Sequence, residues 1–180
     1  MQFIDLNLQN DQLITQALKI GFSKVKKAKI IPLNSGSDLN LVNSKELISI
    51  ESTNSQLLRD CIRQKKPVLC NPLFAPNFYK DIGLIREAAS QETVFEIPIS
   101  EFLKTNFVYR AKLINQTRNF ISRCMKLKAK FVFTSRAVDL LGLKSPQEII
   151  AIASTLFSLT KQQSEFSIST RPEKMLEYLR

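Results

Sequence analysis

Apolar positions recur along this chain at two different spacings, and each spacing predicts a different kind of element. Short, mostly apolar runs are typical of strands inside a sheet, whereas apolar residues that recur every three to four positions are typical of helices with one buried face. The runs predict strands at 2–8, 25–33, 47–51, 67–70, 93–97, 130–134 and 166–169. The helical spacing predicts helices at 11–20, 54–65, 78–90 and 106–127, with three more after residue 144.

These last three helices carry chemical signatures at their starts. Ser145, Pro146 and Glu148 form S-P-x-E. In this capping box the serine hydroxyl accepts from the third helical N–H, proline fits the first turn, and the glutamate accepts from the serine amide. The same box is expected at Thr160 with Gln163 and at Thr170 with Glu173.

The regular alternation of strands and helices predicts an α/β fold with a parallel sheet. At 180 residues, the chain is long enough to bury a core as one domain over 1–180. About seven strands with helices between them predict a compact (β/α) barrel of the TIM type, somewhat irregular because the chain is short for eight full units. In such a barrel, functional groups gather where the strands end.

The net charge of the chain indicates what kind of partner it binds. Lys and Arg outnumber Asp and Glu by 26 to 16, and the net charge of +10 favours an anionic partner. Nucleic acid is the first candidate and a membrane surface the second. No apolar run approaches the roughly 20 residues of a transmembrane helix, and the N-terminus lacks the layout of a signal peptide, so a cytoplasmic protein without membrane attachment is expected. Cys61, Cys70 and Cys124 are odd in number and have apolar neighbours, which favours buried thiols over a disulfide or metal site.

The absence of histidine argues against several kinds of catalytic site. Barrel hydrolases that cleave phosphoesters with clustered metals rely on imidazoles and open with H-x-H, whereas this chain has D-L-N-L at 5–8. We therefore expect no metal site, with Asp5 and Asn7 as hydrogen-bonded residues at the end of the first strand. Glu51 and Glu96 are candidates for acid–base chemistry, but satisfied carboxylates of the barrel core are the favoured interpretation. Serine and threonine have no histidine to activate them, so no catalytic residue is assigned.

The C-terminal part of the chain carries a pattern that resembles a known family. A strand ends in Thr134-Ser135, a polar link leads to Lys144-Ser145-Pro146 at a helix start, and S-I-S-T-R-P at 167–172 precedes the last helix. Together with the preceding segments, this pattern resembles archaeal ribonuclease P protein component 3, a relative of the eukaryotic thirty-kilodalton subunit of ribonuclease P and ribonuclease MRP. The resemblance extends over most of the chain.

The resemblance implies a barrel similar to the polymerase-and-histidinol-phosphatase fold, without its metal ligands. It implies a subunit of ribonuclease P, in which the RNA, with Mg²⁺, hydrolyses precursor tRNA to create the mature 5′ end while the protein helps to fold the catalytic RNA. The isolated chain is then expected to bind no cofactor, to be non-catalytic, and to act on precursor tRNA only indirectly. Family members pair with a small subunit of ferredoxin-like fold, so a heterodimer or heterotetramer is expected.

Six basic residues are predicted RNA contacts because most lie in or beside turns near the barrel rim or a helix start, where a phosphate also meets free amide donors. They are Lys80, Arg110, Arg118, Arg136, Lys144 and Arg171. Lys144 is the strongest candidate, since it directly precedes the S-P-x-E box. Arg110 falls on the apolar side of its helix, so it either reaches past the core or lines the mouth of the barrel. Lys126 and Lys128 are expected to be ordinary solvated charges.

Two other function classes remain open. A free-standing barrel phosphoesterase would act without RNA, and a generic basic RNA-binding domain would need no protein partner. The chain has no tryptophan and few tyrosines, which argues against an extended stacking platform for single strands.

Overall fold

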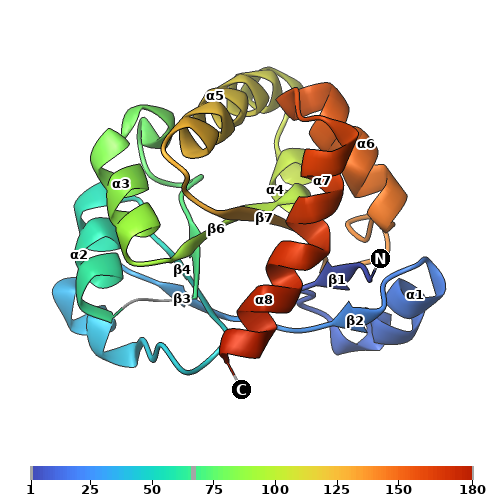
Figure 1. The fold of residues 1–180 in the computed structure, drawn as a ribbon, viewed down its shortest axis with the longest axis horizontal. Coiled ribbons are helices and arrows are strands. Elements are labelled where there is room, and N and C mark those ends of the chain that lie inside the picture. The colour runs from blue at the N-terminus through green and yellow to red at the C-terminus, as the bar shows by residue number, and fades with distance from the viewer. Residues whose placement is uncertain (1, 66–67, 180) are drawn as a thin grey trace.

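Parallel strands lie at the centre of the molecule and helices pack around them (Figure 1). The structure is a computed structural model that describes residues 2–65 and 68–179. Its strands are β1 (Ile4–Asp5), β2 (Lys24–Val25), β3 (Lys29–Pro32), β4 (Ile48–Glu51), β5 (Leu69–Asn71), β6 (Val94–Pro98) and β7 (Phe131–Thr134). They form a pair β1-β2 and a five-stranded sheet in the order β3-β4-β5-β6-β7, with parallel pairing throughout. The predicted α/β class and parallel sheet are confirmed.

Helices follow most of the strands. The α-helices are α1 (Ile14–Lys19), α2 (Ser55–Lys65), α3 (Ile82–Ser90), α4 (Ile99–Lys104), α5 (Phe107–Lys126), α6 (Pro146–Phe157), α7 (Lys161–Ile168) and α8 (Thr170–Tyr178). Short 3-10 helices are η1 (Asp11–Leu13), η2 (Gly36–Leu41) and η3 (Phe78–Lys80). Helix α8 packs against both β1 and β7, and Figure 1 shows it crossing in front of the strands. Among the described residues, no helix is long and apolar enough to cross a bilayer.

The two faces of the five-stranded sheet pack against different groups, because alternate side chains of a strand point to opposite faces. On the outer face, Ile50 and Phe95 belong to the main core, together with the buried sides of α2, α3 and α5. On the inner face, Leu69 and Val94 belong to a second, smaller cluster that includes Met175 of α8. Full burial of such side chains stabilises the fold by about 1.5–3 kcal/mol each.

The predicted strand 25–33 is divided in two because the chain changes its pairing partner. The Lys26 N–H donates to the Asp5 carbonyl at 2.8 Å, so this part is bonded to β1. The Lys29 N–H donates to the Leu47 carbonyl at 2.9 Å, after which β3 pairs with β4. The interruption lies where the pairing passes from one neighbour to the other, so this segment connects the two sheets.

The prediction of a strand at 166–169 is wrong, because these residues complete α7 and lead into α8. The F-S-I-S run fits the two-residue period of a strand, but its serines bond back to the preceding helical turn. The Ser167 hydroxyl donates to the Ser164 carbonyl at 2.6 Å, and the Ser169 hydroxyl donates to the Glu165 carbonyl at 2.5 Å. Serines that bond in this way are compatible with a helix. The seventh strand of the predicted barrel is thus replaced by two helices.

The predicted capping box at Thr170 and Glu173 is also wrong. Thr170 is the first residue of α8, and Ser169 precedes it without a side-chain cap bond. The Glu173 N–H donates instead to the Ser169 carbonyl at 3.1 Å. The Ser169 hydroxyl already bonds to a carbonyl of α7 and does not cap α8. The two helices therefore follow each other without the side-chain bond at the N-cap that a capping box requires.

The other two predicted helix starts are confirmed. The Ser145 N–H donates to Glu148 Oε2 at 2.8 Å while the Glu148 N–H donates to the Ser145 hydroxyl at 3.3 Å, and α7 has the same box at Thr160 and Gln163. Gly21, with φ of +115°, follows the end of α1, and this conformation is one that glycine adopts without strain. Helix α4 was not predicted, and residue 67 of the predicted strand 67–70 lies outside the described residues.

Candidate functional site

Polar side chains occupy the inner face of the sheet toward the carboxyl ends of its strands. Val94 of the smaller apolar cluster is followed two positions later by Glu96, and Val132 is followed by Thr134. Residues two apart share one face of a strand, so the inner face changes from apolar to polar along its length. Ser49 of β4 joins this polar part, and all three polar side chains are buried. The carboxyl end of the sheet is therefore where functional chemistry would be sought.

Glu96 is at the centre of this buried polar network. Its Oε1 accepts from Asn7 Nδ2 at 2.7 Å and from the Thr134 hydroxyl at 2.6 Å. Its Oε2 accepts from the Ser49 hydroxyl. The Glu96 side chain is fully buried, so these donors replace the water that a carboxylate otherwise needs. Glu96 is the satisfied core carboxylate that the sequence favoured.

Asp5 forms a second part of the same network. Its Oδ1 accepts from the Asn7 N–H at 3.1 Å and the Ser135 N–H at 3.2 Å, and its Oδ2 accepts from the Ser135 hydroxyl. Burial raises the pKa of Asp5 to about 6, the hydrogen bonds from Ser135 and Asn7 lower it, and the nearby negative Glu96 raises it. Burial has the largest effect, so the ionised form of Asp5 is disfavoured in the folded chain.

The network also connects the two sheets. Asn7, just after β1, bonds to Glu96 of β6, and Asp5 of β1 bonds to Ser135 just after β7. The Gln9 N–H adds a main-chain bond to the Ala137 carbonyl at 3.0 Å. Since β1 belongs to a different sheet from β6 and β7, these bonds hold the β1-β2 pair against the larger sheet.

An ion pair lies beside this network. Arg136 Nη2 donates to Glu51 Oε2 at 2.6 Å, with side chains only 6% and 21% exposed, respectively. Asn71 Nδ2 is at 3.5 Å from the same carboxylate oxygen. Arg136 has φ of +47°, a conformation uncommon for a residue with a side chain. Its guanidinium is therefore held inward by Glu51.

The polar residues that the sequence places at or near predicted strand ends gather only in part. Those brought together are Asp5, Asn7, Glu51, Asn71, Glu96, Ser135 and Arg136. Asn34 is exposed, and residues 169–171 lie with α8 instead. Sequence reasoning missed Ser49 and Thr134, although a hydroxyl within an otherwise apolar buried strand was a usable signal.

The network satisfies its own polar groups. Asp5, Glu51 and Glu96 each accept hydrogen bonds from neighbouring side chains. Within residues 2–65 and 68–179, no three His, Cys, Asp or Glu side chains come together as a metal-binding group. The three cysteines are buried free thiols, as predicted, and burial raises the pKa of Cys61 to about 12.

A model of the family "RNase P subunit p30" matches residues 18–180. The chain belongs to this family. It is 28% identical to ribonuclease P protein component 3 of Methanothermobacter thermautotrophicus over 94 residues, which cover 52% of this chain and 38% of that protein. It is 20% identical to the protein of the same name from Methanococcoides burtonii over 184 residues, which cover 97% of this chain and 76% of that protein. The family resemblance inferred from the sequence is confirmed.

The fold of this p30-family chain is also similar to a solved structure. The match is to a chain of a cryo-EM structure of archaeal ribonuclease P with mature tRNA, with a TM-score of 0.71 and 17% sequence identity. It covers 98% of this chain and 80% of that chain. The likeness confirms the α/β, TIM-barrel-like fold class.

The basic residues predicted to contact RNA have different surroundings in the p30-family structure. Lys80 is exposed in η3, with its Nζ 5.5 Å from the centroid of the Tyr79 ring. Lys144 is partly exposed directly before α6. Lys126 and Lys128, the expected solvated charges, are both exposed.

Three arginines of the predicted set donate to main-chain carbonyls. Arg110 Nη2 donates to the Leu103 and Thr105 carbonyls at 3.0 and 2.7 Å, so it binds the end of α4. Arg118 Nε donates to the Leu156 carbonyl of α6 at 2.9 Å. Arg171 lies at the other end of the sheet, near the start of β7, where its Nη1 donates to the Phe131 carbonyl at 2.8 Å.

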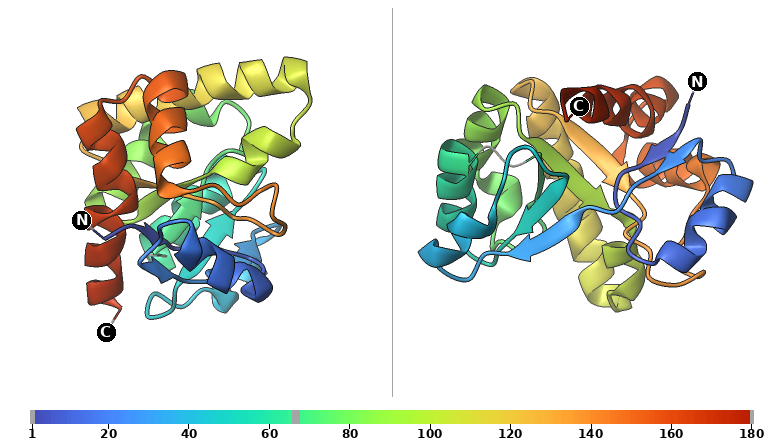
Figure 2. Two further views of the ribbon diagram at one scale, coloured as in Figure 1. Left: turned by 90° about the vertical axis from the view of Figure 1, so that its right-hand side faces the viewer. Right: turned by 90° about the horizontal axis from the view of Figure 1, so that it is seen from below.

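An exposed apolar patch lies at the corner between α4 and α5. It consists of Leu103, Phe107, Val108 and Tyr109, of which Phe107 is 83% exposed. The Arg110 bonds to the end of α4 hold this corner. Figure 2 (left) shows α4 and the start of α5 on the side of the molecule opposite α8. An exposed cluster of large apolar side chains is typical of a protein–protein interface.

Proposed function

We propose that this chain serves ribonuclease P as a binding and scaffolding subunit. In this proposal the RNA hydrolyses precursor tRNA to create the mature 5′ end, and the protein stabilises the folded catalytic RNA. The Mg²⁺ ions that assist hydrolysis are bound by the RNA, and this chain supplies no cofactor of its own. Work on precursor tRNA implies a cytoplasmic location.

The observation that carries this proposal is the closed polar network at the carboxyl end of the sheet. A barrel enzyme places its catalytic groups there. Here the Glu96 carboxylate is buried and accepts from three side chains, and Asp5 is held by Ser135. A general base must come within hydrogen-bond reach of its substrate, and the burial of Asp5 and Glu96 opposes such contact. The position of an active site has been filled by groups that hold the sheets together.

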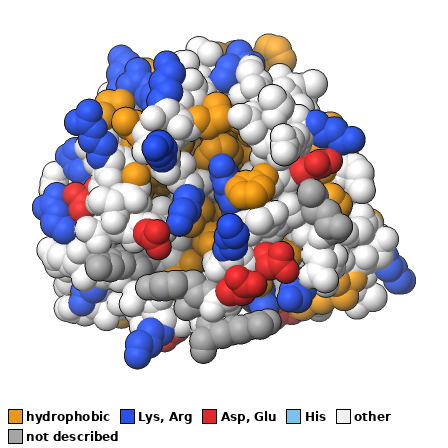
Figure 3. Space-filling view, in the orientation of Figure 1, with side chains coloured by type: hydrophobic (Ala, Val, Ile, Leu, Met, Phe, Trp, Pro, Cys, Tyr) orange, Lys and Arg blue, Asp and Glu red, His pale blue; other side chains and the backbone are white. Residues whose placement is uncertain are grey.

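Charge supports an RNA partner. Phosphate repulsion opposes compaction of an RNA, and a protein with a net charge of +10 reduces that repulsion. Figure 3 shows Lys and Arg side chains spread over one face of the molecule, with few Asp or Glu among them. Contacts of this kind recognise the shape and backbone of structured RNA.

Of the six proposed RNA contacts, Lys80 and Lys144 need the least rearrangement, because Lys80 is exposed and Lys144 is partly exposed. Arg110, Arg118 and Arg171 keep free donors beside their carbonyl bonds, so each can add a phosphate contact. Arg136 must share its guanidinium with Glu51, so its proposed contribution is the smallest.

The apolar patch at the α4–α5 corner supports a protein partner in addition to RNA. We propose that the small ferredoxin-like subunit binds there, giving a heterodimer or heterotetramer. A generic RNA-binding domain has no need for exposed Phe107 and Val108 side chains, which a polar RNA surface would not cover. The Phe107→Glu variant is expected to abolish co-elution with the purified small subunit, whereas Leu141→Glu, at another exposed apolar residue, is expected to retain it.

The function is tested with the purified chain alone and with ribonuclease P RNA. The chain alone is expected to bind this RNA with a steep salt dependence and to cleave no precursor tRNA. Addition of the chain to the RNA and the other subunits is expected to increase 5′ cleavage. Metal-dependent cleavage of precursor tRNA by the RNA-free chain would instead establish a protein enzyme.

A further inference from the structure

A pocket of about 490 Å³ opens at the amino ends of β5, β6 and β7, at the opposite end of the sheet from the polar network. Its apolar floor consists of Val68, Val94 and Met175, members of the smaller hydrophobic cluster. In Figure 3 it is the hollow near the centre, with an apolar floor bordered by Lys and Arg side chains. Barrel enzymes do not build active sites at this end, so a binding role is the one to consider.

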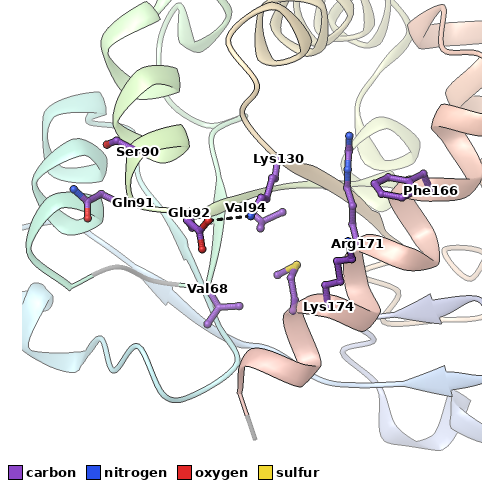
Figure 4. Close-up of a pocket in the computed structure, with 10 residues that line it drawn as sticks. Val68, Ser90, Gln91, Glu92, Val94, Lys130, Phe166, Arg171 and Lys174 are labelled. Carbon is purple, nitrogen blue, oxygen red and sulfur yellow. Dashed lines mark ion pairs between the residues drawn. The ribbon is translucent and has the colours of Figure 1, made fainter.

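The border of the pocket is basic. Figure 4 shows Lys130 and Glu92 on one side and Arg171 and Lys174 on the other. Lys130 Nζ is 3.5 Å from Glu92 Oε1, but these side chains are 53% and 74% exposed, so the pair is weak and Lys130 can exchange it for another anion. The border of the apolar floor therefore carries three cations and one carboxylate.

Arg171 and Phe166 lie next to each other and form the wall on one side of the pocket. The Arg171 guanidinium carbon is 4.4 Å from the centroid of the Phe131 ring and 5.2 Å from that of the Phe166 ring. The bond from Nη1 to the Phe131 carbonyl fixes the guanidinium. Phe166 is 39% exposed despite its size. Aromatic rings and guanidinium planes are the surfaces on which proteins stack unpaired bases.

We propose that this pocket binds a single unstacked nucleotide of RNA, with its base on the Phe166 and Arg171 wall and its phosphate between Lys130 and Lys174. The volume lies in the range of about 300–1,000 Å³ that is usual for ligand pockets. An acidic peptide would also satisfy the lysines, but it would leave this wall and the apolar floor without a partner. Burial lowers the pKa of the Arg171 guanidinium, so a bound anion also compensates a partly desolvated charge. The assignment of the nucleotide to an RNA chain rests on the proposed function. The side chains of the pocket themselves would suit any nucleoside phosphate.

The pocket is tested by titrating the full chain with adenosine 5′-monophosphate and following backbone amide signals by NMR. The expected shifts are in residues 90–94, 130 and 166–175, with adenosine alone and inorganic phosphate alone binding at least about tenfold more weakly. Phe166→Ala is expected to weaken binding at least about fivefold through lost stacking, and Lys174→Gln to reduce its salt dependence. Phe74→Ala and Lys126→Gln, which change an exposed aromatic and an exposed lysine outside the pocket, are expected to leave binding unchanged.

Competition identifies the occupant. If RNA is the source, ribonuclease P RNA displaces the mononucleotide, and Phe166→Ala weakens both ligands while thermal melts show a folded chain. If the pocket binds the mononucleotide but bound RNA does not displace it, the natural ligand is not a nucleotide of RNA. The pocket would then be a site for a free nucleotide. If the chain binds no structured RNA, the proposed function is contradicted. The mononucleotide titration then still decides whether the pocket binds a nucleotide. Shifts outside the pocket, or equal displacement by a tetraglutamate peptide, would overturn the nucleotide assignment.

Discussion

Replacing Asp5 by Asn tests whether the buried polar network contains a carboxylate that is costly to ionise. Asp5 is 1% exposed, and its oxygens accept from the Asn7 N–H, the Ser135 N–H and the Ser135 hydroxyl. Asparagine has the same shape, and its carbonyl oxygen can accept both N–H groups. Its Nδ2 can donate to the Ser135 hydroxyl, which then acts as acceptor. The substitution thus removes a charge and keeps the three bonds.

The magnitude follows from the pKa of Asp5, which burial raises from 3.8 to about 6. A difference of about two units at about 1.4 kcal/mol each amounts to about 3 kcal/mol. Because the folded-state pKa is the higher one, the folded chain binds the proton first as the pH falls. The free energy of unfolding therefore rises as the pH falls from about 6 to about 4, and is reduced by this group above about pH 6.

We therefore expect Asp5→Asn to be more stable than the natural chain by up to about 3 kcal/mol near pH 7.5. The difference is expected to shrink to near zero at about pH 3, where the natural carboxyl is largely protonated in both states. Urea unfolding followed by circular dichroism at constant ionic strength measures it. Asp11→Asn is the matched control, since it removes the same charge from a side chain that is 68% exposed. A variant less stable than the natural chain at neutral pH, or a difference independent of pH, would show that the network stabilises the ionised carboxylate and would refute the reasoning.

Three further predictions concern side chains of the C-terminal part. Lys144→Ala is expected to lower the logarithmic salt slope of RNA binding by about one unit, and an equal effect of Lys126→Ala would show that binding is diffuse. Arg136→Met is expected to destabilise the chain by about 3 kcal/mol in urea unfolding because it removes the ion-pair partner of Glu51. Adding Glu51→Gln to this variant should recover part of the lost stability. A change near zero for Arg136→Met would contradict a stabilising role of the ion pair. Ser145→Ala is expected to lower the free energy of unfolding by about 1 kcal/mol, measured by thermal unfolding, through loss of the α6 cap. Ser145→Thr keeps a hydroxyl and should lower it less. Equal losses in the two variants would argue against a capping role.

Local signals predicted much of the fold. The boxes at Ser145 and Thr160 gave the starts of α6 and α7, because a capping box is formed by residues within one turn. The run at 166–169 failed because four alternating residues also fit a helix whose serines bond back to the previous turn. The break within 25–33 depends on which strand lies on each side, and no local pattern contains that information.

The candidate site was less predictable because its contacts join distant parts of the chain. The sequence placed Asp5 and Glu96 at strand ends and favoured satisfied core carboxylates, which is how they are found. Their partners Ser49 and Ser135 depend on how the strands are ordered in space. The surroundings of Arg136 could not be predicted either, because whether an arginine after a strand points outward depends on the carboxylate that the neighbouring strand supplies.

Both the polar network and the pocket follow from the helices that replace a last strand. A strand at 166–169 would have paired with β7 through main-chain bonds, and its alternate side chains would have filled the inner face. Instead α8 packs against β1 and β7 and brings Arg171 and Lys174 over the amino ends of the strands. The side-chain bonds of Asp5 and Asn7 then hold β1 to β6 and β7 at the carboxyl ends. Weakening this connection should therefore destabilise the docking of the β1-β2 pair before it affects the five-stranded sheet.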